Sequence, residues 1–198
     1  TMAIQLAKHV FKARLVVTTA SNGEKEKLCK SLGADVVVDY KTTKFEEVYG
    51  GINAEKFDIC FDTTGESLKM TEIVKDGGRI VTIAGMATLE ELRRIGGTAW
   101  ILKLFVKRRV KRKEYKAAQS KNADWDYLFL SPSRDDLSTL ADHLENGVIK
   151  PVLDGVWDFH SEDSEEGWQG AFNRSFSGRA KGKCVVPVSY THLTLPTI

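Results

Sequence analysis

Residues 57–65, Phe-Asp-Ile-Cys-Phe-Asp-Thr-Thr-Gly, form a short apolar run that is followed at once by polar and small residues. Such a run, bounded by a turn signal, is typical of a strand buried in a parallel sheet. Residues 79–85, Arg-Ile-Val-Thr-Ile-Ala-Gly, repeat the pattern after the turn 76–78. Because ligands of open parallel sheets bind at the carboxyl ends of the strands, the residues that end these two runs are the first candidates for a site.

Strand-like and helix-like stretches alternate over most of the chain. The predicted strands are 15–19, 35–40, 57–62, 79–83 and 127–130, and the predicted helices are 25–32, 45–49, 68–75 and 135–145. The chain also starts in helical register at Thr1, and a basic, partly helical region follows residue 89. Strands separated by helices indicate an α/β fold with a doubly wound parallel sheet. After Pro151 a strand-like stretch (152–159), a helix (165–176) and a strand (183–186) leave that sheet.

Composition excludes several classes of protein. The 198 residues are 42% hydrophobic and 28% charged, which is the range of ordinary globular proteins rather than of disordered or collagen-like ones. A net charge of +2 is too small for bulk attraction to nucleic acid or to an anionic membrane. The sequence holds no apolar run of 18 residues, so we expect no membrane span. Three cysteines without a C-x-x-C motif favour a reduced, cytoplasmic protein over a disulfide framework or a metal cage, and no histidine motif predicts a metal site.

The segments TMAIQLAK, LVVTTAS, LCKSLGADVVVDY, FDICFDTTG, DGGRIVTIAG and GRAKGKCVV together resemble the medium-chain dehydrogenase/reductase superfamily, in its quinone oxidoreductase-like, NADPH-dependent, zinc-binding dehydrogenase-like branch. The resemblance runs from Thr1 to about Val186 and implies a Rossmann-type sheet. In that family a glycine-rich G-x-G-G-V-G turn precedes the helix that here begins at Thr1. We therefore expect the chain to lack that turn, the first strand and most of the catalytic domain.

This resemblance predicts three segments. Residues 1–148 are expected to be a partial NADP-binding Rossmann domain, and residues 149–187 a segment that returns to the absent catalytic domain. Residues 188–198 contain no Asp, Glu, Lys or Arg and look like translated adapter DNA. In the strand order 3-2-1-4-5-6 the missing strand would lie between 15–19 and 57–62, so we expect the sheet to open there and the isolated chain to be marginally stable.

The end of the strand 15–19 indicates the choice of cofactor. A cofactor without a 2′-phosphate favours a carboxylate at this point, whereas the sequence has Thr-Thr-Ala-Ser at 18–21 and Lys25 four residues later. Hydroxyl groups and a cation suit a phosphate dianion, and the predicted cofactor is NADPH. By resemblance, Ser21, Lys25 and Tyr40 match the 2′-phosphate contacts of the family. The alternative is that Lys25 is an ordinary solvated lysine and Tyr40 an aromatic residue at a strand end.

Further residues are expected to line the cofactor because they follow strands of the predicted sheet or belong to the GRAKGK signature. These residues are Asp62, Thr63, Thr64, Ala84, Gly85 and Lys183. For the glycines, simple turn geometry is the competing interpretation.

The resemblance implies hydride transfer from NADPH to a quinone or to an activated alkene such as an enone or enal. We assign no catalytic residue, because the substrate pocket of the family lies against the absent domain. The expected partner is a small-molecule substrate, with neither nucleic acid nor a membrane span, and a homodimer is compatible with the sequence. An organellar address is equally compatible, since the N-terminus is expected to be missing.

Two alternatives stay open. Residues 103–121 hold six lysines and three arginines against Glu114, so a non-catalytic member of the fold could bind RNA or a membrane surface there. The apolar residues between 101 and 110 favour a helix with a solvated basic face instead. A methyltransferase is the third reading, but that class favours an acidic residue after its second strand and has no use for Lys25.

Overall fold

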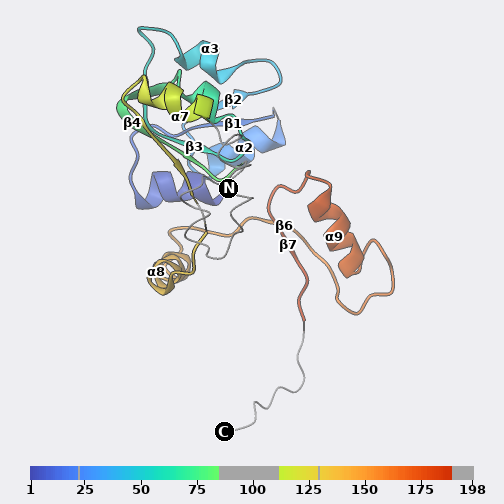
Figure 1. The fold of residues 1–198 in the computed structure, drawn as a ribbon. Helices are drawn as coiled ribbons and strands as arrows, with labels where there is room; N and C mark the ends of the chain where they lie inside the picture. Colours follow the sequence, from blue (N-terminus) through green and yellow to red (C-terminus); the bar gives the residue numbers. More distant parts are fainter. Residues whose placement is uncertain (22, 85–111, 129, 189–198) are drawn as a thin grey trace, which may run out of the picture. The chain divides into compact units, whose positions relative to one another are not determined.

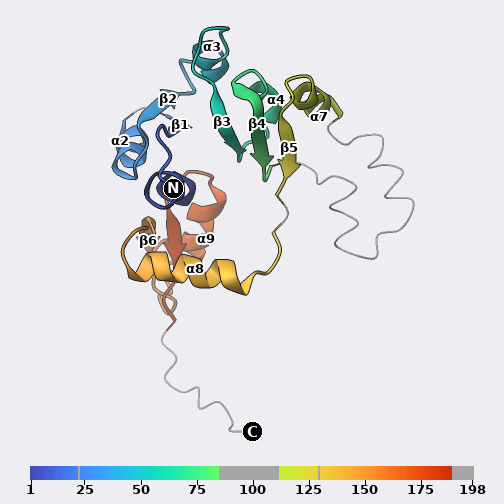
Figure 2. The same ribbon diagram turned by 90° about the vertical axis from the view of Figure 1, so that its left-hand side faces the viewer.

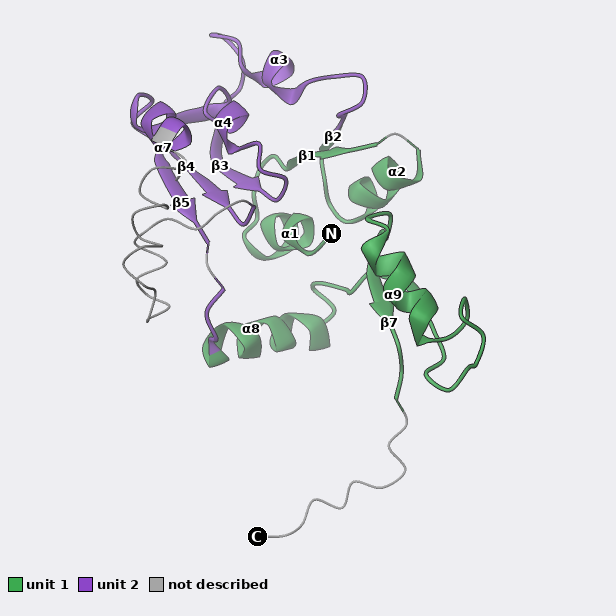
Figure 3. Ribbon diagram, turned by 45° about the vertical axis from the view of Figure 1, so that its right-hand side comes forward, with its two compact units in different colours: residues 1–37, 134–198 green, residues 38–133 purple. Residues whose placement is uncertain are grey.

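The computed structural model describes residues 1–21, 23–84, 112–128 and 130–188 (Figure 1). Two compact units make up the chain. Residues 1–37 and 134–198 form unit 1, and residues 38–133 form unit 2 (Figure 3). The predicted boundary after residue 148 falls inside unit 1 and stays a prediction. Most of the expected adapter-derived tail, from residue 189 onward, lies outside the described residues.

Unit 2 is built on three parallel strands. They are β3 (Phe57–Asp62), β4 (Val74–Thr82) and β5 (Asp124–Tyr127), in the spatial order β3-β4-β5 (Figure 2). Cys60, Ile80 and Trp125 stand opposite one another in the register and are all buried. Because alternate side chains point to opposite faces of a strand, these three residues form the centre of one covered face.

The described residues of unit 2 form three helices: α3 (Phe45–Tyr49), α4 (Ser67–Met70) and α7 (Arg112–Gln119). Helix α7 contributes the fully buried Ala118 to the cluster around Ile80. Helix α3 contributes Tyr49, whose ring meets that of Phe57 edge-on with 5.0 Å between the ring centroids. The buried face of the sheet is therefore closed by short helices that place small or aromatic side chains on it.

Unit 1 contains the two ends of the described chain. Its elements are α1 (Met2–Gln5), the π-helix η1 (Leu6–Val10), β1 (Val17–Ala20), α2 (Glu24–Ser31), α8 (Arg134–Glu145), β6 (Leu153–Val156), α9 (Trp168–Phe176) and β7 (Lys183–Val185). β1 pairs with β2 (Val36–Asp39), which runs into unit 2, and β6 pairs with β7 in parallel.

A buried glutamine ties the first helix to the distant residue 150. The amide oxygen of Gln5 accepts a hydrogen bond from the main-chain N–H of Lys150 at 2.8 Å, and its amide nitrogen donates to the carbonyl oxygen of Lys150 at 2.9 Å. Within the first eleven residues Ile4 and Gln5 are buried, whereas Phe11 is exposed. The side-chain amide of Gln5, bonded to both main-chain groups of Lys150, thus anchors this helix.

The predicted alternation of strands and helices is confirmed, but boundaries differ. The strand predicted at 79–83 begins at Val74, so the turn predicted at 76–78 lies inside β4. Two further shifts have a clear cause. The predicted helix 68–75 ends at Met70, because the main-chain N–H of Phe57 bonds to the carbonyl of Ile73 and draws Val74 into the sheet. The predicted strand 127–130 is observed at 124–127, since Trp125 pairs with Ile80 in the core. In both places a tertiary contact moves the boundary that local sequence suggests.

The described strands are distributed over separate hydrogen-bonded sheets. β1 belongs to one sheet with β2, and β3 to another with β4 and β5. Within the described ranges no strand joins β1 to β3. The α/β class with parallel strands is therefore confirmed, while the strands are distributed over separate sheets.

Asp154 holds together β6, α9 and the turn before β7. Its carboxylate, 5% exposed, accepts hydrogen bonds from Arg174 Nε at 2.6 Å and Nη2 at 3.1 Å, and from the main-chain N–H of Lys181 at 2.7 Å. The bond from Arg174, followed by that from Lys181, lowers the pKa of Asp154 to about 2. Gly182 is required next to this contact, because a Cβ atom there would lie 2.2 Å from the carbonyl oxygen of Val152.

This arrangement predicts a pH-dependent contribution to stability. Because the folded-state pKa lies below the ordinary value of 3.8, the Asp154 carboxylate stabilises the fold above that value, and the stabilisation is lost as pH falls toward about 2. Asp154→Asn should lower the melting temperature by several degrees at pH 7, with the difference narrowing below pH 4. Thermal unfolding followed by circular dichroism over a pH series measures it.

Asp158→Asn is the matched control, since Asp158 is exposed and its carboxylate receives the main-chain N–H of His160. Equal melting temperatures of the parent and the Asp154→Asn chain at pH 7 would show that the hydrogen bonds of Asp154 contribute nothing to stability.

Candidate functional site

The turns that follow β3 and β4 meet at the carboxyl edge of the sheet in unit 2. A Cβ atom built on Gly65 would lie 4.0 Å from the Cβ of Ala84, so the two turns are in van der Waals range. Gly65 has a φ of +89°, a conformation that side chains rarely adopt. Two neighbouring strands therefore end in small residues at the edge where parallel sheets bind their ligands.

A buried hydrogen-bond network holds these two turns. Asp62 Oδ1 accepts from the main-chain N–H groups of Thr64 at 3.0 Å, Gly65 at 2.8 Å and Glu66 at 3.1 Å, and Asp62 Oδ2 accepts from Thr82 Oγ1 at 2.9 Å. The same Thr82 oxygen accepts from the main-chain N–H of Ala84 at 3.1 Å. Asp62 and Thr82, which face each other in the strand register, are both 0% exposed.

The network keeps Asp62 ionised. Burial by itself would raise the pKa of this carboxyl group, but the three main-chain N–H groups and the Thr82 hydroxyl outweigh it and lower the pKa. Both carboxylate oxygens are occupied and no part of the side chain is exposed. Asp62 can therefore set the shape of the edge, and a ligand meets the neighbouring residues first.

The residues around Asp62 offer an open surface of mixed character. Thr63, Thr64 and Gly65 are exposed, and the Thr64 hydroxyl lies 3.3 Å from a carboxylate oxygen of Glu66. Ile83 and Leu128, at the ends of β4 and β5, are exposed apolar side chains. Small residues beside apolar ones fit the flat face of an aromatic or nicotinamide-like ring. Gly85, the remaining residue predicted for this edge, lies outside the described residues.

Two predicted phosphate contacts lie at the start of α2 in unit 1. Ser21 follows β1, and Lys25 stands in the first turn of α2; both are half-buried. Within the described part of the chain neither side chain has a hydrogen bond or an ion pair. No side chain caps α2, whose N-cap residue is Gly23 with a φ of +82°. The Lys25 ammonium group and the Ser21 hydroxyl therefore lie at the start of a helix whose N-cap residue has no side chain, a combination suited to an anion.

The other two predicted contacts stand elsewhere. Tyr40 follows β2, belongs to unit 2 and exposes its ring, with no hydrogen bond to its hydroxyl in the described ranges. Lys183 opens β7, and its main-chain N–H bonds to the carbonyl of Val152 at 2.7 Å while its side chain is exposed.

The structure adds two residues that the sequence predictions missed. Thr82 holds Asp62, and only its place opposite Asp62 in the register reveals that role. Lys181, two residues before Lys183, forms an ion pair with Glu24 at the start of α2. Sequence offers no signal for this pair, because 157 positions separate the two residues.

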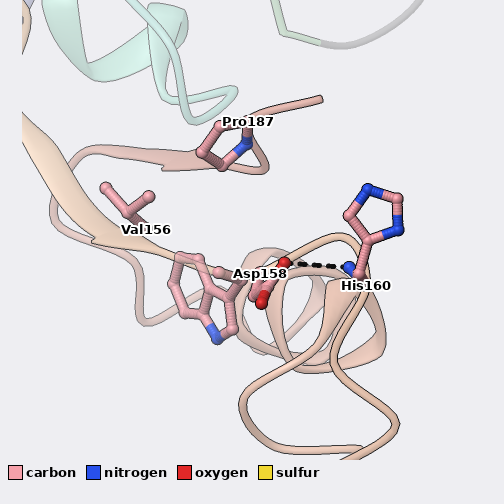
Figure 4. A pocket seen from close by; sticks show the side chains of 5 residues that line it. Val156, Asp158, His160 and Pro187 are labelled. Carbon is pink, nitrogen blue, oxygen red and sulfur yellow. Dashed lines mark hydrogen bonds between the residues drawn. The ribbon is translucent and has the colours of Figure 1, made fainter. Parts of the chain in front are cut away.

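A shallow hollow in unit 1 lies apart from the predicted residues. It has a volume of about 420 Å³ and is lined by Val156, Trp157, Asp158, His160 and Pro187 (Figure 4). Its carboxylate, on Asp158, already accepts the main-chain N–H of His160 at 2.9 Å. The hollow therefore offers little beyond one indole face, and none of the predicted cofactor residues lines it.

In the described part of the chain, no group of three or more His, Cys, Asp or Glu side chains is arranged to hold a metal ion. Burial raises the pKa of the Cys60 thiol to about 12, so this cysteine is a core residue rather than a nucleophile.

The described part of the basic segment has the form of a solvated helix. In α7, Ala118 is buried in the core whereas Lys113 and Lys116 are exposed. Residues 103–111 of this segment lie outside the described ranges. Across the residues that are described, no helix is long and apolar enough to cross a membrane.

Comparison with known proteins agrees with the sequence resemblance. A family model described as zinc-binding dehydrogenase matches residues 32–186. The chain is 31% identical to the 2-methylene-furan-3-one reductase of Solanum lycopersicum and 29% identical to the chloroplastic NADPH-dependent alkenal/one oxidoreductase of Arabidopsis thaliana, each over 185 residues. Both alignments cover 93% of this chain and 36% of the plant protein, so the chain spans about a third of their length.

The fold has the same relatives. The quinone oxidoreductase of Coxiella burnetii matches with a TM-score of 0.68 at 20% identity, over 95% of this chain and 49% of that protein. At this level of identity the match supports the fold alone: the parallel strands align with the cofactor-binding part of such an enzyme. Taken with the family model, which covers most of the sequence, it leads to one conclusion. The chain belongs to the zinc-binding dehydrogenase family of the medium-chain dehydrogenase/reductase superfamily and is related to its quinone oxidoreductases and alkenal reductases.

Proposed function

We propose that this chain is the NADP-binding part of an oxidoreductase that delivers hydride to a quinone or to an activated alkene such as an enone or enal. The observation that carries the cofactor assignment is the end of β1, where Ser21 and Lys25 lie at the start of α2 and neither side chain has a hydrogen bond or an ion pair to another described residue. The names of the plant relatives, an alkenal/one oxidoreductase and a furanone reductase, support the substrate class.

The chain's own residues would bind and orient the cofactor. Ser21, Lys25 and Tyr40 would hold the 2′-phosphate, and Thr63, Thr64 and Ala84 would border the nicotinamide half, with Asp62 keeping their turns in place. The bound cofactor would supply the hydride, and the protein would supply position and electrostatics. We assign no metal to the described residues, and the substrate itself is a small molecule.

Replacing Lys25 tests the phosphate assignment. A charge-assisted hydrogen bond contributes about 1.5–3 kcal/mol, which corresponds to roughly 10- to 100-fold in affinity. Lys25→Gln should therefore weaken NADPH binding about tenfold or more, and Lys25→Glu should weaken it further through repulsion, with NADH binding unchanged by Lys25→Gln. Isothermal titration of both cofactors measures the effect.

The exposed Lys27 of the same helix supplies the control variant Lys27→Gln, which should bind both cofactors as the parent does. Equal affinities of the parent chain for NADPH and NADH would sink the proposal.

Replacing Asp62 tests the role of the edge. Asp62→Asn leaves three main-chain N–H groups and the Thr82 hydroxyl facing a neutral amide, and we expect the free energy of unfolding to fall by about 1–3 kcal/mol. The affinities for NADPH and for NADH should fall to the same extent, because the turns move while the phosphate contacts stay in place. Urea unfolding and titration of each cofactor measure the two effects.

Asp58→Asn, on an exposed position of the same strand, should change neither property appreciably, since surface ion pairs contribute little. A selective loss of NADPH in the Asp62→Asn chain would instead place Asp62 at the phosphate.

A further inference from the structure

The turn before β7 brings a second lysine to the start of α2. Lys181 Nζ forms an ion pair with Glu24 Oε2, and Glu24 directly precedes Lys25 in the first turn of α2. Both residues of the pair belong to unit 1. The lysine at this helix end is thus Lys181, whereas the GRAKGK signature draws attention to Lys183.

Lys181 differs from an ordinary surface lysine because its backbone is anchored on both sides. Its main-chain N–H donates to the nearly buried carboxylate of Asp154 at 2.7 Å, and Arg174 binds the same carboxylate through two nitrogens. The next residue, Gly182, sits so close to Val152 that a Cβ would meet its carbonyl oxygen at 2.2 Å. The path of the turn is therefore fixed, and with it the point from which the Lys181 side chain starts.

The balance of charge at this helix end favours an anion. Lys181 and Lys25 supply two cations, and the first turn of α2 holds two carboxylates, Glu24 and Glu26. Glu26 is paired with Lys30 at 2.7 Å, which leaves Glu24, whose pKa is lowered by its hydrogen bond to Lys181, as the acidic group opposite the two cations. The Glu24 side chain is 80% exposed, whereas that of Lys181 is 38% exposed. A phosphate dianion could replace the exposed Glu24 as the partner of Lys181, and it would gain Lys25 and the helix N–H groups at the same time.

We propose that Lys181 is a specificity-determining residue for the 2′-phosphate of the cofactor, held in readiness at the start of α2 by its ion pair with Glu24. The proposal rests on the function proposed above and adds to it a residue and a competition: Glu24 and the 2′-phosphate are alternative partners of one ammonium group. The proposal predicts opposite changes in affinity for the 2′-phosphate: removing the charge of Lys181 weakens binding, whereas neutralising Glu24 strengthens it.

Two small molecules isolate this contact. Adenosine 2′,5′-bisphosphate carries the 2′-phosphate and 5′-AMP lacks it, so the ratio of their affinities reports on that group alone. Titration of the full 198-residue chain with each probe, at low and at physiological salt, gives this ratio for the parent and for variants. Melting temperatures of the same samples report on folding.

We expect Lys181→Gln to lose about tenfold in affinity for the bisphosphate and none for 5′-AMP. Lys181→Arg should restore most of the loss, since the guanidinium also binds phosphate. Glu24→Gln should bind the bisphosphate several-fold more tightly than the parent. Lys150→Gln, an exposed lysine of the same unit, is the matched control and should behave as the parent.

The outcomes separate the two proposals. If Lys25→Gln loses the bisphosphate while Lys181→Gln binds as the parent does, the role of Lys181 is overturned and the proposed function stands. If the parent itself does not prefer the bisphosphate to 5′-AMP, the proposed function fails and takes the role of Lys181 with it. An equal loss of both probes with a lower melting temperature in Lys181→Gln, not rescued by Lys181→Arg, would show a structural role and overturn the inference. Weaker rather than tighter binding by Glu24→Gln would refute the competition.

Discussion

The bond between the Asp62 carboxylate and the Thr82 hydroxyl, 2.9 Å long and fully buried, is the constraint on which the candidate edge of the sheet depends. Parallel strands end side by side, and the turns that leave them cannot pair their N–H groups within the sheet. One carboxylate here accepts three such groups from the first turn, and through Thr82 it also fixes the second. A charged acceptor suits this task, since bonds to an ionised group are stronger than neutral ones and the buried charge is compensated on both oxygens.

The same solution recurs in unit 1, where Asp154 binds the Arg174 guanidinium and the main-chain N–H of Lys181. In both units a carboxylate on or at the end of a strand shapes a turn, and residues of that turn are the ones that we propose to meet the cofactor. These aspartates therefore act behind the proposed binding surface. An acidic residue that follows a strand is easily mistaken for a ligand contact, and only burial and hydrogen bonding reveal that it supports the turn.

In the proposed function, selectivity between two cofactors that differ by one phosphate would depend on a few charges near the end of β1. One of these charges would be that of Lys25 in the first turn of α2. The other would be that of Lys181, which lies 157 positions along the chain from its partner Glu24. In the proposed competition, Glu24 neutralises Lys181 until a phosphate replaces it. The cationic residues could then stay in place without forming an unpaired cluster of positive charge. The competition also explains why an acidic residue can stand beside a phosphate site without excluding the phosphate.

Local sequence determined much of this protein by itself. Apolar runs such as 57–62 and the polar or small residues after them predicted the strands and the turns, since a buried strand and a turn have different side-chain requirements over a few residues. The quoted motifs also placed the chain in its superfamily, whereas the choice of NADPH from the Thr-Thr-Ala-Ser sequence and Lys25 stays a prediction. Tertiary structure alone decided where the predicted helix 68–75 stops and where β5 begins, because backbone pairing with Ile73 and the packing of Trp125 against Ile80 outweigh local preference. It also decided that the buried Asp62 holds two turns in place and is not exposed to a ligand. It decided as well that Lys181, rather than Lys183, forms an ion pair at the start of α2. Both facts depend on how distant segments pack, since packing determines burial and long-range ion pairs.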